Sequence, residues 1–422
     1  MLIKIGSINE VLYNHLKEGQ GAAEYLRLKI PRLAEELEQF FITRSDIQRI
    51  QKAEALAERI LELTDFSDLV PIRSGVATLE IKRRISYDKQ TDHTAHTLYL
   101  YLLGIWVYDN IPSLRKPIDD SIQSSNPIHM FLFQWTYASL LHDIGYLFSQ
   151  ELEKDAGESP YASIFDNIFN LDSIKRYAGV LSEENSMKLE ELWRTFEEKY
   201  KITSISTINS KPDIIHQLDH IPWLVDLGLK TNSGLDALME TNIEEMTVRD
   251  FALFMATKGY SGNTVVDHGV ASGLMLLKYS SIWYWICNEA QQKYLSLYEE
   301  LTKNYKYPLK VFIRHVIPAC KATAYHNLTN TKFNLTDNPI LFLAVLCDEL
   351  QVWDRFLSGH KYIDNWSTVE HCMSEDVIVE KETNSNEQLL HFTVSNYYCE
   401  KITNTLEKRV ANWSNYVRIS SN

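Results

Sequence analysis

The sequence predicts an all-α fold that ends in a small β-hairpin followed by a helix. Glycine and proline, which interrupt helices, are scarce, with 15 and 11 in 422 residues. Apolar residues recur at helical spacing over most of the chain. The content of 45% hydrophobic and 23% charged residues is ordinary for a folded globular protein. This length allows one large domain or two medium ones.

Residues 1 to about 70 are expected to form helices. Apolar residues at helical spacing cover 22–41, and they do so again over 46–66, after the capping residues Ser45 and Asp46. A short irregular stretch, SDLVPIRSG, is expected to follow.

The central part of the chain alternates buried helices with polar connections. Residues 96–107 are almost wholly apolar, as in a buried helix, and 109–127 are rich in Pro, Ser and Asp, which predicts a loop. The apolar segment 128–148 contains the pair His142-Asp143. Helical patterns resume over 265–301, 308–328 and 338–358.

The long interval between Asp143 and His268 exceeds what a helix-to-helix connection needs. We interpret 144–264 as an inserted cap or partner surface, with its own helix over 181–201. Near the C-terminus, 375–382 and 388–395 alternate apolar and polar residues and predict the hairpin. The predicted division is therefore a helical extension (1–75), a central domain (76–360) and a small α/β appendage (361–422).

Charge and composition limit the class of partner and the location. A formal net charge of −14 argues against a broad nucleic-acid surface, because phosphate backbones attract Lys and Arg. Five cysteines without CxxC spacing indicate reduced thiols. The N-terminal residues lack the apolar core of a signal peptide, and no run reaches roughly 18 apolar residues. We expect a cytoplasmic protein with no membrane partner.

Six residues carry the clearest chemical signal, and all of them lie in segments that we expect to be helical. They are His96, His142, Asp143, His268, His326 and Asp348. Imidazole and carboxylate groups together suit Mn, Fe, Mg, Zn or Ni. Because they are far apart in sequence, tertiary folding must bring them together, as in metal sites inside helix bundles. A lone His in an apolar helix is usually a hydrogen-bonded core residue, but the ordered set favours ligation.

The sequences around these residues resemble the HD-domain superfamily of metal-dependent phosphohydrolases. HTLYLYLLG is similar to that family's first-His helix, and LLHDIGY to its His-Asp helix. HGVASGLMLL and AYHN resemble the segments that supply two further His ligands in two-metal members, and LCDELQVWDR resembles the last-Asp helix. These strings occur in the family's order and cover about 95–355.

The resemblance implies an HD helical bundle with two metal ions. His96, His142, Asp143 and Asp348 would bind the first ion, and His268 and His326 with a bridging Asp143 would bind the second. The ions would activate a hydroxide between them and hold phosphoryl oxygens for in-line displacement, which is phosphoester hydrolysis. His142 and Asp143 would thus be catalytic as well as ligating.

Cationic and polar residues near these positions are candidates for binding the substrate. Lys321, five residues before His326, is our first choice for a catalytic cation, and Arg314 and Arg355 are candidates for substrate binding. His93 is a further candidate because it lies one helical turn before His96. Arg355, in a later turn of the helix of Asp348, could instead be the partner of that carboxylate. Weaker candidates are Lys82, Arg83, Arg84 and Lys278, and the pair His216 and His220, which lacks an evident third ligand.

Several functions within and outside this chemistry stay open. A two-metal phosphodiesterase or nucleotidase is favoured by His268 and His326. A dNTP triphosphohydrolase is disfavoured because GYLFSQELEKD follows the His-Asp pair in place of that subgroup's Gly-His-Pro-Phe-Gly-His extension. An HD-type nuclease stays open, and so does a nucleotide-binding sensor or scaffold without turnover. We expect a nucleotide or similar small phosphoester as substrate, and the insertion and the tail leave room for a homo-oligomer or a regulatory partner.

Overall fold

The computed structural model describes residues 2–64, 66, 69–87, 93–148, 171–200, 268–303, 311–327, 332–355, 372–382 and 390–421. They belong to two compact units, which we treat separately. Unit one comprises Met1–Thr64, Val76–Leu141 and Leu328–Asn422, and unit two comprises Asp65–Gly75 and His142–Asn327. The predicted all-α class is consistent with both units, because helices dominate the described residues.

Unit one contains ten helices among its described residues, one of which begins in unit two. They are α1 (Ile8–Glu18), α2 (Ala22–Lys29), α3 (Leu33–Ile42), α4 (Asp46–Leu63), α5 (Val70–Tyr87), α6 (Thr94–Asn110), α7 (Pro112–Ile122), α8 (Pro127–Ala138), α21 (Pro339–Leu350) and α23 (Asn396–Arg409). In α5, the residues from Val76 onward belong to this unit.

Helix α6 is the centre of unit one. Every residue from Thr94 to Tyr108 is buried, as expected of a helix that is apolar on all sides. It packs against α1, α2, α4, α7, α8 and α21. Gly104 allows the Trp135 indole of α8 to approach closely, and the indole N–H donates to the carbonyl of Tyr101 at 2.9 Å. The first turn of α6 is held by Glu80, whose carboxylate accepts from the backbone N–H of Thr94 at 3.0 Å.

Three local expectations are corrected by the structure. The predicted loop over 109–127 contains helix α7, in which Pro112 stands at the first helical position and Leu114, Ile118 and Ile122 face the core. The stretch expected to be irregular after residue 66 contains the start of α5. The first residues of the chain form a strand, β1 (Leu2–Ser7), where helix was expected.

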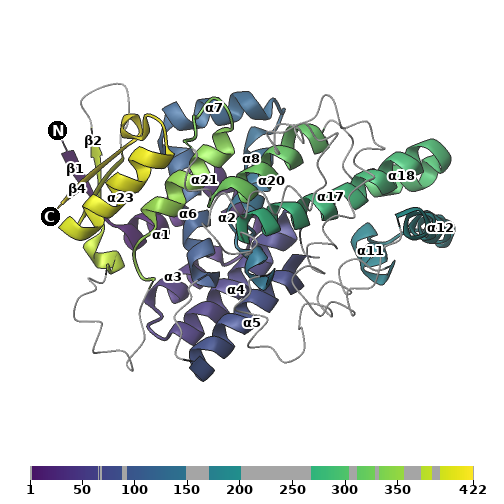
Figure 1. Ribbon diagram of the computed structural model, residues 1–422, viewed down its shortest axis with the longest axis horizontal. Coiled ribbons are helices and arrows are strands. Elements are labelled where there is room, and N and C mark those ends of the chain that lie inside the picture. The colour runs from purple at the N-terminus through teal and green to yellow at the C-terminus, as the bar shows by residue number, and fades with distance from the viewer. Residues whose placement is uncertain are drawn as a thin grey trace, which may run out of the picture. The chain divides into compact units, whose positions relative to one another are not determined.

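The predicted hairpin is part of a four-stranded sheet in the order β1-β2-β3-β4. Strands β2 (Ile378–Glu382) and β3 (Leu390–Val394) pair antiparallel, close to the predicted positions. Strand β1 adds to β2 antiparallel, and β4 (Val417–Ser421) pairs parallel to β3. Alternate residues of β3 are buried, and helix α23 packs against β3 and β4 (Figure 1). The buried residues of α23 include Tyr398, Ile402 and Leu406.

Unit two is organised around α17 (His268–Lys293), the long green helix in Figure 1. This helix packs against α12 (Glu183–Tyr200), α18 (Leu295–Lys303), α20 (Ile317–Tyr325), the 3-10 helix η2 (Ile144–Phe148) and the π-helical turn η4 (Phe312–Val316). Helix α11 (Leu171–Ala178) packs against α12. Aromatic side chains fill this core, with the rings of Phe196 and Trp285 5.1 Å apart.

The fold leaves some predictions on organisation untested. The limits at 75 and near 143 lie next to limits of the two units, and most of the proposed insertion 144–264 falls outside the described residues. The HD character of the bundle stays a prediction. None of the described helices is both long enough and apolar enough to span a membrane.

Candidate metal centre

Asp143 lies at the centre of a buried histidine cluster in unit two. Its Oδ1 is 3.2 Å from Nε2 of His142, 3.3 Å from Nε2 of His268 and 3.8 Å from Nε2 of His326. The side chains of these four residues are between 2% and 12% exposed, so little bulk water competes for them. A buried carboxylate oxygen surrounded by three imidazole nitrogens is a donor set that suits a divalent transition metal.

Turns, in addition to helices, place these side chains, which corrects the expectation that all six residues are helical. His142 and Asp143 lie in a turn directly before η2, and His326 follows the last residue of α20. On a straight helix, adjacent side chains diverge by about 100°. The turn allows His142 and Asp143 to approach each other. His268 is the first residue of α17, and the other two ligand candidates, in unit one, are helical.

Two glycines bring the ligand-bearing segments together. A Cβ at Gly145 would lie 1.9 Å from the carbonyl oxygen of His268, so η2 meets the start of α17 at a distance that only glycine allows. A Cβ at Gly273 would lie 2.6 Å from Cβ of Ala324 and 2.8 Å from the carbonyl oxygen of Cys320. The first contact sets His268 beside Asp143, and the second sets α17 against the helix that precedes His326.

Hydrogen bonds and ring contacts orient the imidazoles. Nδ1 of His326 lies 2.7 Å from the carbonyl oxygen of Thr323, an acceptor, so Nδ1 carries a proton and Nε2 is the ring nitrogen with the lone pair in the neutral imidazole. Nε2 of His268 is 3.3 Å from Nε2 of His326, and the Tyr146 ring stacks on His268 with centroids 4.0 Å apart. The ligand atoms of His142, Asp143 and His326 lie within 4.8 Å of one another, close enough to hold one ion.

The two remaining ligand candidates form a second pair, in unit one. Nε2 of His96, in α6, is 2.9 Å from Oδ1 of Asp348, in α21. Nδ1 of His96 lies 2.5 Å from Oε1 of Gln351, a residue that is 1% exposed. The guanidinium of Arg355 is 3.6 Å from Oδ1 of Asp348 and also contacts the His96 ring. Arg355 lies beyond the end of α21, so it does not belong to a later turn of that helix as expected.

The charge of Asp348 acts on its two neighbours in the chain, Cys347 and Glu349. Burial, and after it the charge of Asp348, raises the pKa of the Glu349 carboxyl, while Arg409, which is hydrogen-bonded to Glu349, lowers it. Burial and the same Asp348 charge raise the pKa of the Cys347 thiol well above its ordinary value. A cation bound at Asp348 would offset this charge.

The other predicted residues lie in varied surroundings. His93 is half-buried at the start of α6, and Arg314 is exposed in η4. The Lys321 ammonium lies over the ring of Tyr325, 5.6 Å from its centroid. The side chains of Lys82, Arg83, Arg84 and Lys278, and the whole of His216 and His220, lie outside the described residues.

Sequence reasoning missed the residues that orient the ligands. They are Tyr146, Ser272, Thr323 and Gln351. Ser272 joins two backbone groups, because its Oγ accepts from the N–H of Gly145 at 2.7 Å and donates to the carbonyl of His268 at 2.8 Å. Each missed residue lies three or four positions from a ligand candidate, which is the spacing of side chains that meet on a helix or turn. That spacing is a signal that could have found them.

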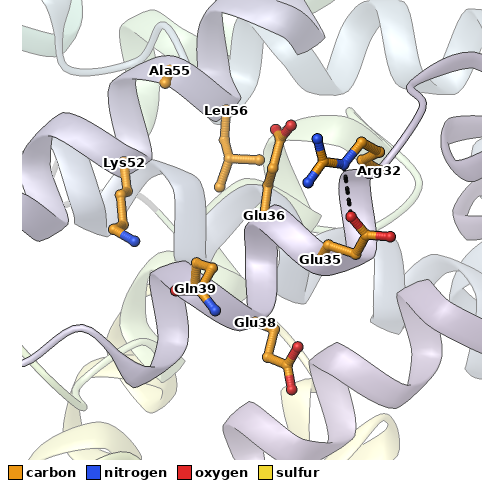
Figure 2. A pocket seen from close by; sticks show the side chains of 8 residues that line it. All are labelled: Arg32, Glu35, Glu36, Glu38, Gln39, Lys52, Ala55 and Leu56. Atoms are coloured by element: carbon orange, nitrogen blue, oxygen red, sulfur yellow. Dashed lines mark hydrogen bonds and ion pairs between the residues drawn. The ribbon is translucent and has the colours of Figure 1, made fainter.

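A separate cavity of about 550 Å³ lies between α3 and α4 in unit one. Its walls carry both signs of charge, with Arg32 and Glu35 paired at 2.7 Å (Figure 2). None of the residues predicted to bind metal or substrate lines it. The cavity also lacks His, Cys and Asp side chains, so we assign it no catalytic role.

The comparisons with known proteins add no relative. No family model, no curated protein and no solved structure matches this chain.

Proposed function

We propose that this chain is a divalent-metal-dependent phosphohydrolase of the HD-domain type that acts on a nucleotide or a similar small phosphoester. One observation carries the proposal: a single buried carboxylate oxygen, Oδ1 of Asp143, lies within 3.2–3.8 Å of three imidazole nitrogens. The His96–Asp348 pair, at 2.9 Å, adds a second imidazole–carboxylate set. The order of the six residues along the chain supports the family resemblance.

The donor set fits a metal for a reason independent of that resemblance. The proton of His326 is held on Nδ1 by the carbonyl of Thr323, and the Nε2 atoms of His268 and His326 are 3.3 Å apart. Two nitrogens so close cannot both carry a proton on the side where they face each other. At least one imidazole lone pair and one carboxylate charge therefore point toward the same place, which a divalent cation stabilises.

Each residue has a defined task under this proposal. Asp143 supplies the negative charge that holds the cation, and His142, His268 and His326 supply neutral nitrogen ligands. His96 and Asp348 would be a separate ligand pair in unit one, and Arg355, in contact with both, would bind a phosphate oxygen. A bound divalent cation supplies Lewis acidity, which lowers the pKa of water and stabilises charge on phosphoryl oxygens. Burial of the ligands strengthens every one of these electrostatic interactions.

The test is a substrate survey with matched variants. The Mn²⁺-loaded protein would be incubated with dNTPs, NTPs, cyclic mono- and dinucleotides and single-stranded DNA, and the products identified by mass spectrometry. Asp143→Asn and His96→Gln should each abolish turnover. His129→Gln is the matched control, because the imidazole of this half-buried histidine is hydrogen-bonded to Tyr25 and lies outside both ligand sets.

The chemical identity of the reaction product would distinguish the possible enzyme subclasses. Released triphosphate would indicate a dNTP triphosphohydrolase, released monophosphate a nucleotidase, a linearised nucleotide a phosphodiesterase and a cut strand a nuclease. Absence of turnover by metal-loaded wild-type protein, with nucleotide still bound, would favour a sensor or scaffold. Turnover that survives Asp143→Asn would refute the proposed site.

A further inference from the structure

Gln351 makes a buried hydrogen bond to the ligand candidate His96, and its own orientation is fixed. Its Nε2 amide group donates to the carbonyl of Trp353 at 2.7 Å. Its Oε1 must therefore be the end that faces His96, and Oε1 also accepts from Nε of Arg355 at 2.8 Å. Because an amide oxygen is only an acceptor, the 2.5 Å contact to Nδ1 of His96 requires a proton on that nitrogen.

The proton on Nδ1 determines that Nε2 is the ring nitrogen available to bind a metal. In a neutral imidazole with Nδ1 protonated, Nε2 carries the lone pair. Nε2 is the atom that lies 2.9 Å from Oδ1 of Asp348. The guanidinium of Arg355 touches both ring nitrogens and so selects neither, whereas Gln351 contacts Nδ1 alone.

The turn that carries Gln351 is hydrogen-bonded to several other segments of unit one. Its Asp354 adopts a left-handed conformation (φ 56°), which is unfavourable for a residue with a Cβ unless its surroundings hold it. The Asp354 carboxylate accepts from the Tyr99 hydroxyl at 3.0 Å and from the backbone N–H of Ser374 at 3.0 Å. Arg49, itself buried, donates to the Asp354 carbonyl at 2.9 Å.

Helix α6 is attached to this turn at two points on one face. His96 meets Gln351, and Tyr99, one helical turn later, meets Asp354. The Tyr99 side chain is fully buried, and burial, with the Asp354 charge adding to it, raises the pKa of its hydroxyl well above the ordinary value. The Tyr99 hydroxyl therefore keeps its proton at neutral pH and donates it to Asp354. The two contacts fix the distance and the rotation between the His96 ring and the Gln351 amide.

We propose that Gln351 is a positioning residue that holds His96 in the Nδ1-protonated tautomer, so that Nε2 is the metal-binding atom. The metal part of this inference rests on the proposed function, while the tautomer is a property of the chain alone. Such partners of ligating histidines typically contribute a factor of about 10–100 to metal affinity.

The tautomer is measured directly on the metal-free, full-length protein. Long-range proton–nitrogen NMR of protein with ¹⁵N-labelled histidine distinguishes protonated from unprotonated ring nitrogens, and the His96 signals are those missing from His96→Gln. We expect a protonated Nδ1 in the wild type, whereas Nε2, 2.9 Å from the Asp348 carboxylate, carries a second proton only in the imidazolium form. Gln351→Leu, which removes the acceptor, should lose this preference, and Gln351→Glu, which keeps an acceptor at the same position, should retain it.

Mn²⁺ affinity, measured by calorimetry on the same variants, gives a second readout. Gln351→Leu should bind about 10–100-fold more weakly than the wild type, and Gln351→Glu should recover most of the loss. A wild-type His96 without a proton on Nδ1 would overturn the inference, and so would a folded Gln351→Leu with unchanged Nδ1 protonation and unchanged Mn²⁺ affinity. If the wild type binds no metal, the proposed function fails, yet the wild-type NMR spectrum still decides the role of Gln351, even where Gln351→Leu does not fold.

Discussion

Gly145→Ala is the substitution whose consequences follow most directly from the geometry of the histidine cluster. The added methyl group would lie 1.9 Å from the carbonyl oxygen and 2.8 Å from the carbonyl carbon of His268, and 2.8 Å from the backbone nitrogen of Ser272. All three are backbone atoms in the first two turns of α17, so no side-chain rotation relieves the contact. Real Cβ atoms essentially never approach within 3.0 Å, so η2 and α17 must separate by about 1 Å.

The expected losses of stability and of Mn²⁺ affinity follow from two energies and one displacement. Overpacking of a tight core contact costs about 1–3 kcal/mol. Loss of the 2.7 Å hydrogen bond from Gly145 to Ser272 costs about 1 kcal/mol more. The free energy of unfolding should therefore fall by about 2–4 kcal/mol. A shift of about 1 Å also exceeds the roughly 0.5 Å that a ligand set tolerates, so Mn²⁺ affinity should fall at least tenfold.

The assay is urea denaturation in the presence of chelator, followed by calorimetric Mn²⁺ titration of the folded variant. Ser272→Ala is the matched comparison, because it removes the same hydrogen bond without adding an atom, and it should cost only about 1 kcal/mol. A Gly145→Ala protein with wild-type stability and wild-type affinity would refute the account of how His268 is positioned.

Three further predictions concern other parts of the chain. Gly104→Ala places a methyl group 2.0 Å from Cζ2 of Trp135 and should lower the free energy of unfolding by about 1–3 kcal/mol; a change below about 0.5 kcal/mol in urea denaturation would contradict the close packing of α6 on α8. Burial, with the Arg314 charge adding to it, lowers the pKa of His315 from 6.5 to about 4, so between these values the unfolded chain binds a proton that the folded chain does not. Stability should therefore fall as the pH drops from about 6.5 to about 4, and His315→Gln should weaken this dependence in denaturation curves of metal-free protein; equal slopes in both proteins would count against it. Iodoacetamide should modify half-exposed Cys399 before the four buried cysteines. Burial limits access of the reagent to those four and raises the pKa of the Cys320 and Cys347 thiols, which leaves less reactive thiolate. Equally fast labelling of Cys320, measured by mass spectrometry, would be inconsistent with its burial.

Local patterns were enough to predict most of the helices. The buried character of α6 follows from its unbroken apolar sequence, and the start of α4 from its cap at Ser45. Helix α7 was mistaken for a loop because its Pro, Ser and Asp residues outweighed a visible pattern of apolar residues every four positions. Strand β1 was missed for a different reason, because its pairing partner, β2, lies more than 370 residues away in the sequence.

Residue type and order singled out the candidate ligands, while the residues that support them were missed. In the structure Asp143 lies beside His142, His268 and His326, and His96 lies beside Asp348. The assignment of these residues to two metal ions stays a prediction. The turn at His142 and Asp143 was not foreseen, because the apolar run before it continues the helical pattern. Gln351 is an ordinary polar residue in the sequence, and only the folded chain shows which atom of His96 it contacts.

The most direct test of the central claim is the number of metal ions that the chain binds. Chelator-treated, full-length protein would be dialysed to equilibrium against Mn²⁺ and its metal content measured, with Asp143→Asn and His129→Gln treated in parallel. We predict saturable binding of up to two ions per chain, lost on Asp143→Asn and retained on His129→Gln. Absence of binding by the wild type, or binding that Asp143→Asn leaves unchanged, would contradict the proposed metal centre.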